Sequence, residues 1–344
     1  MRWPLFGVLV AAAQFIVAAG EKKEEEINAS PVAISVSVML MGSISFQMLM
    51  FYLVNWPDRD IQRYSWQVIS QTISIFCAVL LFQACNGIVE EYLIEGASEV
   101  SEVLIDIGHM FFWLIMMQIV LAITSGAVHD LIGGEAPTME KVELNLKSWS
   151  VLFSHVAGFA TINAWGSLQQ TYFKGSPQSA LLVVPIGFIG LQVLFAAMDS
   201  IRWKISHMDD GEEDEFEHKW DEETEEAEND VAGLSLSFLT VQALRFYISG
   251  ILPNAEGIEP WEDSISHGGG QWHSLIYMGF GFFALSIGVL SSEKFMKEPS
   301  ERVERVIEIL NNYFTFGMSW CFFYGVRWAI SSTQFTSENV NTLV

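Results

Sequence analysis

The hydrophobic pattern of the chain is a series of long uncharged segments separated by short charged stretches. Most of these segments reach the length of about 20 residues that an α-helix needs to cross the hydrocarbon core of a membrane. We therefore predict an all-α membrane helix bundle, a single transmembrane domain over residues 31–330 with eight transmembrane helices. The predicted helices are Pro31–Val54, Ser65–Val89, Val103–Val128, Ser148–Thr171, Ser179–Trp203, Val231–Leu252, Trp272–Leu290 and Val306–Ile330.

The fourth predicted helix, Ser148–Thr171, differs from the others because polar and small residues interrupt it. At about 100° per residue, most of these positions fall within an arc of roughly 140°. Hydrocarbon does not satisfy polar side chains, so this face must pack against other helices or line a water-filled path. The side chains that we expect to contact solute or water are His155, Thr161, Asn163 and Gln169.

The first 20 residues combine one basic residue, an apolar centre and the small residues at positions 18–20. This pattern predicts a secretory signal peptide, with an uncleaved first helix as the alternative. Residues 21–30 then form a short outer or lumenal segment, in which Asn28 begins a glycosylation sequon. Pro31 directly follows the sequon and disfavours its use.

Lysine and arginine residues in the loops predict the orientation of the helices. The cations expected on one side are Arg59, Arg63, Lys141, Lys147, Arg202, Lys204, Lys294, Lys297, Arg302 and Arg305, against Lys22, Lys23 and Lys174 on the other. The richer side should be cytosolic, which makes residues 331–344 an outer or lumenal tail. We expect the protein in the plasma membrane or in the secretory and endomembrane system, with both mature termini outside or in a lumen.

The formal charge of −24 is concentrated in the loops and in one acidic tract. Residues 204–230 contain this tract, and their low apolar content predicts a disordered cytosolic loop within the transmembrane domain. Such a loop disfavours nucleic acid as a partner and suits a basic cytosolic protein.

Two groups of polar side chains at membrane depth are candidates for chemistry. The group expected near the cytosolic side is a cation or proton site formed by His129, Asp130, Asp199 and Asp230. The group expected near the outer side consists of ion pairs among Arg245, Arg327, Glu90, Glu91 and Asp106. Helix capping and simple interfacial pairing are the structural alternatives. Pro185 should loosen the fifth predicted helix and provide a hinge.

Three cysteines all lie in predicted helices, so the sequence contains neither a disulfide framework nor a zinc-type spacing. The leading hypothesis is a cation or proton transporter or channel, because both expected mouths are acidic. Its partners would be the lipid bilayer and a small cation or proton, and a homo-oligomer is compatible with it.

Two alternatives stay open at this stage. One is a membrane-anchored adaptor or receptor that uses the acidic loop to bind a basic protein. The other is an intramembrane haem or metal redox protein that uses His109, His129 or His155 as a ligand. The leading hypothesis predicts no cofactor and no enzymatic activity.

Overall fold

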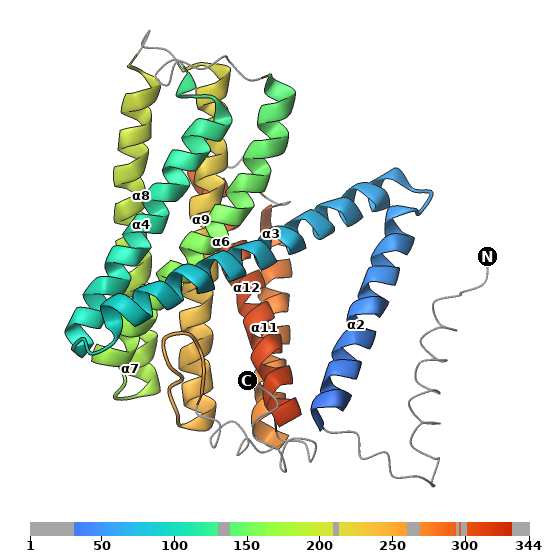
Figure 1. Ribbon diagram of the computed structural model, residues 1–344, viewed down its shortest axis with the longest axis vertical. Coiled ribbons are helices and arrows are strands. Elements are labelled where there is room, and N and C mark those ends of the chain that lie inside the picture. The colour runs from blue at the N-terminus through green and yellow to red at the C-terminus, as the bar shows by residue number, and fades with distance from the viewer. Residues whose placement is uncertain are drawn as a thin grey trace. The chain divides into compact units, whose positions relative to one another are not determined.

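The computed structural model describes residues 31–129, 138–208, 213–259, 269–293, 296 and 301–331 (Figure 1). Every regular element within these ranges is a helix, so the predicted all-α class is confirmed. The chain divides into two compact units, Met1–Met48 with Asn341–Val344, and Leu49–Val340. Several predictions concern residues outside the described ranges. They are the signal peptide, the segment 21–30 with Asn28, the residue Asp130, and all but the first residue of the tail 331–344.

Helix α2 (Pro31–Val54) begins in the first unit and ends in the second. The second unit contains the other helices. These are α3 (Arg59–Val89), the π-helical turn η1 (Glu90–Ile94), α4 (Glu99–Ser125), α6 (Met139–Tyr172), α7 (Pro177–Leu181), α8 (Val183–Ser206), α9 (Glu215–Ser249), α11 (Gly269–Glu293) and α12 (Glu301–Ser331).

Five helices of the described residues are long and apolar enough to cross a membrane, which supports a multi-pass membrane protein. They are Arg59–Ile94, Glu99–Ser125, Pro177–Ser206, Glu215–Ser249 and Gly270–Ser292. Helices occupy all eight predicted positions, but eight membrane crossings are not confirmed. Helices α6 and α12 are long enough, yet polar and small residues lower their hydropathy.

The second unit repeats one arrangement of helices. The long helices α3, α6, α9 and α12 pack beside one another in chain order, with α3 running obliquely to the others in Figure 1. Helices α4, α8 and α11 pack on α6, α9 and α12, respectively. An apolar helix is thus followed by a longer helix whose first turns carry charges, as in α9 and α12.

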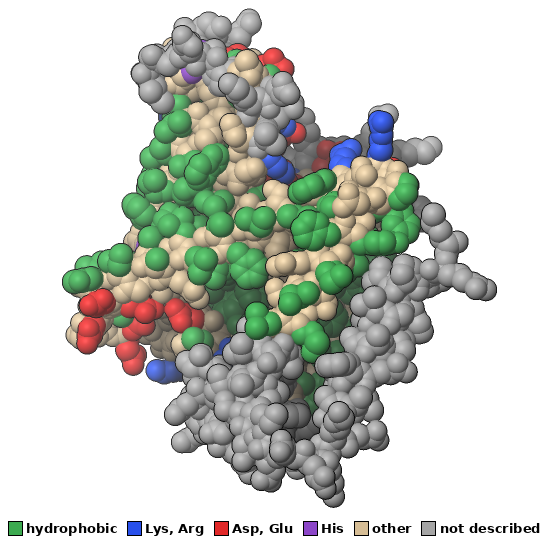
Figure 2. All heavy atoms as spheres, turned by 45° about the vertical axis from the view of Figure 1, so that its right-hand side comes forward, with side chains coloured by type: hydrophobic (Ala, Val, Ile, Leu, Met, Phe, Trp, Pro, Cys, Tyr) green, Lys and Arg blue, Asp and Glu red, His purple; other side chains and the backbone are tan. Residues whose placement is uncertain are grey.

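Burial differs between the two kinds of helix. In α9 most side chains from Val231 to Ala243 are buried, whereas α4 and α8 expose large apolar side chains such as Ile119 and Val193. Figure 2 shows hydrophobic side chains spread over the face in view. A surface of this kind suits acyl chains, and packing between such helices depends on close contact rather than on burial from water.

The prediction of a disordered loop over residues 204–230 is wrong for most of its length. Helix α8 continues to Ser206, and α9 begins at Glu215 after a capping box formed by Asp214 and Glu217. Acidic side chains of the first turns are buried because cations of other helices neutralise them. Lys147 of α6 pairs with Glu223 at 3.6 Å, for example. Composition alone does not reveal partners that are distant in sequence.

Candidate functional site

The segment Gly250–Glu259, here called the strap, connects the end of α9 to the other long helices. Gly250 has a φ of 79° and ends α9 in the left-handed region that glycine tolerates. Gln170 of α6 and Gln242 of α9 donate hydrogen bonds to backbone carbonyls of the strap. At Gly166 of α6, an added Cβ would lie 2.8 Å from a carbonyl oxygen of the strap, so glycine permits this close approach.

A buried ion pair fixes the end of the strap. The guanidinium of Arg245 lies 2.5 Å from the carboxylate of Glu259, to which the indole of Trp328 also donates at 2.9 Å. The same guanidinium stacks on the ring of Tyr324, 3.6 Å from its centroid.

The predicted acidic partners of Arg245 are therefore wrong. The partner is Glu259, which the sequence places in a loop, rather than Glu90, Glu91 or Asp106. Arg327 is a half-buried residue of α12. The outer group of predicted site residues is thus divided between two places, and its acids are free for another role.

Asn86 of α3 lies at the centre of a set of polar contacts between α3, α6 and the strap. Its amide nitrogen donates to Glu90 at 2.7 Å and to Glu256 of the strap at 3.2 Å. Its amide oxygen accepts a hydrogen bond from Asn163 of α6 at 3.1 Å. Glu90 also begins the π-helical turn η1, and such turns are frequent at functional sites.

Asp106 of α4 adds a buried carboxylate to this region. Its side chain is 3% exposed, and its Oδ2 accepts a hydrogen bond from Ser167 of α6. The other oxygen, Oδ1, is buried and has no hydrogen-bond partner among the described residues. No salt bridge found in the described part of the chain includes Asp106, so its charge is not matched by a lysine or arginine.

His109 lies one turn further along α4, on the same side of the helix as Asp106. Its ring stacks on Phe82 of α3 with a centroid distance of 5.7 Å. Its Nε2 accepts a hydrogen bond from the indole of Trp113 at 2.8 Å. Its Nδ1 is buried without a partner among the described residues.

These side chains form what we call the polar cluster. Its members are Asn86, Glu90, Asp106, His109, Asn163, Ser167 and Glu256. Glu90 and Glu256 are exposed, whereas Asp106 is buried, so the cluster extends from the surface into the bundle. The pKa of Glu256 is raised, mainly because its carboxylate is partly buried and secondly because the negative charge of Glu90 is near. Carboxylate and amide oxygens of this kind attract protons and hard cations.

Of the four path residues predicted on α6, only Asn163 belongs to the polar cluster. Thr161 donates to the carbonyl of Ala157 in its own helix. Gln169 is fully buried and donates to the carbonyl of Ala180 at 2.9 Å.

His155 is likewise satisfied locally. Its Nδ1 lies 2.8 Å from the carbonyl of Val151, one turn earlier in α6, and its ring meets Phe316 of α12 edge to face. The polar side of α6 thus packs on neighbouring helices at these positions, and the side of Ala157 and Ala160 is buried as well.

The three described residues of the predicted cytosolic cation site, Asp199, Asp230 and His129, each contact another protein group. Asp199 lies 3.4 Å from Arg202, Asp230 accepts from Asn312 at 3.0 Å, and His129 contacts a carbonyl of its own turn. The described residues contain no group of three or more His, Cys, Asp or Glu side chains that could hold a metal ion.

Arg202 instead organises this end of α9. Its guanidinium lies 2.6 Å from Glu228 and 2.8 Å from Asp221, and Gln118 of α4 donates to Glu228 at 2.8 Å. Both Arg202 and Glu228 are almost fully buried. This network ties α4, α8 and α9 together.

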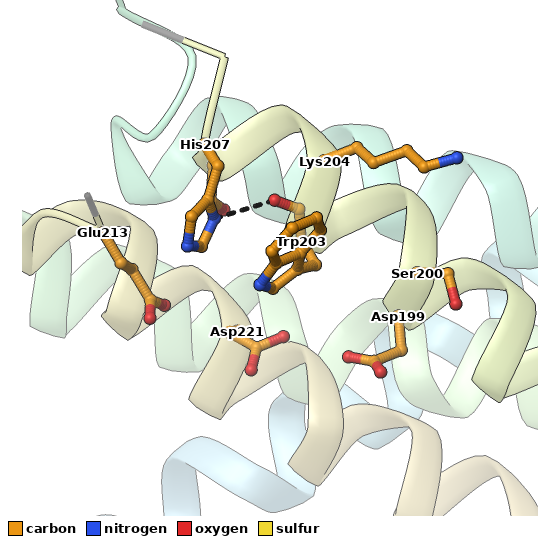
Figure 3. A pocket seen from close by; sticks show the side chains of 8 residues that line it. Asp199, Ser200, Trp203, Lys204, His207, Glu213 and Asp221 are labelled. Carbon is orange, nitrogen blue, oxygen red and sulfur yellow. Dashed lines mark hydrogen bonds between the residues drawn. The ribbon is translucent and has the colours of Figure 1, made fainter. Parts of the chain in front are cut away.

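A polar cavity of about 490 Å³ lies beside Arg202 (Figure 3). Trp203 and His207 stack there at a centroid distance of 4.5 Å, and Lys204 points away from Glu213. Two of the carboxylates that line the cavity already bind Arg202. The cavity therefore offers less uncompensated negative charge than its acidic lining suggests.

The fifth predicted helix lies in one continuous apolar segment, Pro177–Ser206, in which the single residue Leu182 separates α7 from α8. Leu182 itself has right-handed helical angles, with φ −64° and ψ −21°. Pro185 follows in the first turn of α8 and lacks a backbone N–H donor. That Pro185 provides a hinge stays a prediction.

Sequence reasoning missed several residues of the polar cluster. Asn86 is a single amide in an apolar helix, Ser167 resembles an ordinary small packing residue, and Glu256 lies in a loop. The four-residue spacing of Asn86 and Glu90 was the available signal, because it places both on one helix face. Comparison with known proteins finds no matching family model, no matching curated protein and no matching solved structure.

Proposed function

We propose that the protein is a transporter or channel that moves a small cation or a proton across a membrane through the polar cluster. One observation carries the proposal, namely the buried carboxylate of Asp106 with one unpartnered oxygen and no cationic partner among the described residues. An ionisable group inside a membrane bundle is costly to bury and is by default a functional candidate.

The surroundings of Asp106 support this role. The exposed Glu90 and Glu256 raise the local concentration of cations at the entrance of the cluster. Asn163 and Ser167 bring α6 into the cluster, in agreement with a path beside this helix. Membrane residence is supported by the five apolar helices, while the compartment and the orientation of the termini remain part of the proposal.

The two alternative functions have less support. An adaptor would need the acidic side chains of the tract to be accessible to a basic partner. At the helical start of α9, Glu223 and Asp221 already pair with Lys147 and Arg202, respectively. A haem or metal redox protein would use His109, His129 or His155 as a ligand, and one ring nitrogen of each already contacts a protein group.

Purified protein in liposomes tests the proposal. Gradients of sodium, potassium or protons are imposed one at a time, and we expect flux of at least one species. Asp106→Asn should reduce this flux about tenfold or more, which corresponds to the loss of about 1.4 kcal/mol of charge interaction. Glu99→Gln is the matched control, because it removes an acid that is 71% exposed at the start of the same helix. Equal flux in wild type and Asp106→Asn for every species would refute the proposal.

A further inference from the structure

The hydrogen bond from Trp113 determines the proton position on His109. An indole N–H can only donate, so the Nε2 of His109 must be the unprotonated acceptor at 2.8 Å. The neutral ring then carries its proton on Nδ1. A second proton on Nε2 would break the bond to Trp113, so the ring is held as a donor through Nδ1.

Two unsatisfied groups of opposite kind consequently lie one turn apart on α4. The Nδ1–H of His109 is a donor, the Oδ1 of Asp106 is an acceptor, and both are buried without a partner among the described residues. Their residues are 9% and 3% exposed, respectively. A buried polar group left unsatisfied costs about 1–3 kcal/mol, so each such group calls for an explanation.

One small ligand can satisfy both groups if it accepts from Nδ1–H and donates to Oδ1. Water has this combination, and a bare metal ion does not, because an N–H donor points its positive end at the ligand. The charged groups that act on Asp106 are Glu102 of α4 and Glu90, and Asp106 in turn acts on Glu256 of the strap. All of them are acids, so a proton on Oδ1 of Asp106 relieves their repulsion without placing a positive charge against the N–H donor of His109.

We infer that Asp106 and His109 together bind one water molecule, and that the cargo of the path is a proton rather than a metal ion. The inference rests on the proposed function. A hydronium ion that reaches the bound water passes one proton to it while the bound water passes another to Oδ1 of Asp106, which leaves two neutral waters and a neutral carboxylic acid. The reverse transfer releases it. His109 orients the water and keeps its own proton.

Flux measurements on proteoliposomes test the nature of the cargo. A trapped pH-sensitive dye reports proton entry under an imposed pH gradient, and ion-sensitive dyes report sodium and potassium. We expect proton flux alone in wild type and in Glu99→Gln, and a loss of about tenfold or more in both Asp106→Asn and His109→Phe. Phenylalanine keeps the stacking on Phe82 but has no N–H to orient a water.

The outcomes separate the two proposals. A sodium or potassium flux that depends on Asp106 would sustain the proposed function and overturn the proton inference. Proton flux that His109→Phe leaves unchanged would also overturn it, whereas flux of every kind that ignores Asp106 would overturn both.

A second measurement does not depend on flux. Nitrogen-15 NMR of histidine-labelled protein, with His109 assigned from its absence in His109→Phe, should show a proton on Nδ1 and none on Nε2. A protonated Nε2 would overturn the inference even if proton flux were found.

Discussion

Glu259→Gln is the sharpest test of the strap, because this carboxylate compensates a buried charge. The substitution keeps the size of the side chain and an oxygen that can accept from Trp328. It removes the negative charge 2.5 Å from the guanidinium of Arg245. Arg245 is 1% exposed, so water cannot take over the role of Glu259 without opening the strap.

The expected cost follows from the burial of both groups. Removing one partner of a buried ion pair leaves an uncompensated charge and typically costs about 3–5 kcal/mol. The contact of Arg245 with Tyr324 at 3.6 Å offsets only part of this, about 1–2 kcal/mol for a desolvated cation–π pair. We therefore expect Glu259→Gln to lower the free energy of unfolding by about 1–4 kcal/mol.

Reversible unfolding in mixed detergent micelles, followed by tryptophan fluorescence, measures this change. The double variant Glu259→Gln with Arg245→Met removes the orphaned charge and should recover at least about 1 kcal/mol relative to Glu259→Gln alone. Lys174→Met is the control, since its pair with Glu99 is 3.9 Å long and exposed. A cost below about 1 kcal/mol for Glu259→Gln, or no recovery in the double variant, would refute the reasoning.

Three further predictions concern other parts of the bundle. Arg202→Met should destabilise the protein by about 3–5 kcal/mol in the same unfolding assay, because it removes the closest cation of the buried Glu228. Lys204→Met on the exposed side of α8 should change stability by less than about 0.5 kcal/mol, and similar effects of the two variants would contradict the network. Gly233→Ala should lower the free energy of unfolding by about 1–3 kcal/mol, since an added Cβ would lie 2.9 Å from a side-chain carbon of α12. Gly281→Ala should be tolerated, because an added Cβ there would meet nothing within 4 Å. Equal free energies of unfolding for the two variants would rule out the close contact at Gly233. Because the pKa of Glu256 is raised above 4.5 by partial burial and by Glu90, its protonation favours the docked strap, so the stabilisation is complete below pH 4.5 and is lost as the pH rises through the raised value. Hydrogen exchange of the strap amides should increase over that window, and a window that persists in Glu256→Gln would exclude this residue as its origin.

The positions of the helices were predictable because apolar length is a local property of the sequence. Pro31–Val54 was predicted with the bounds that the structure gives to α2. The starts of α6 and α9 were predicted too late, at Ser148 and Val231 instead of Met139 and Glu215. The charged start of α9 is helical because a capping box and Lys147 of α6 stabilise it, and neither contributes to hydrophobic length.

The candidate site was predictable only in part, since it depends on which helices are neighbours. The sequence indicated that α6 must be buried and that Asp106 lies at membrane depth. It did not indicate that Ser167 meets Asp106 or that Asn86 meets the strap, because both contacts join segments far apart in the chain. The assignment of Asp106 to Arg245 failed for the same reason, as the strap turns back and supplies Glu259 first.

The partners of the buried carboxylates distinguish structural from functional sites in this bundle. Glu228 pairs with Arg202, and Glu259 pairs with Arg245. Glu228 and Arg245 lie about 25 Å apart along α9 at a rise of about 1.5 Å per residue. These two pairs tie both ends of α9 to other elements and match the charges of Glu228 and Arg245. Asp106 is as deeply buried, but its carboxylate accepts only from Ser167 among the described residues. Burial of an unmatched carboxylate costs several kcal/mol, and nothing in the packing around it requires an acid at that position. A protein that only needed a stable α4 would be better served by a neutral residue there, which supports the proposal that the path passes Asp106 rather than the ion pairs.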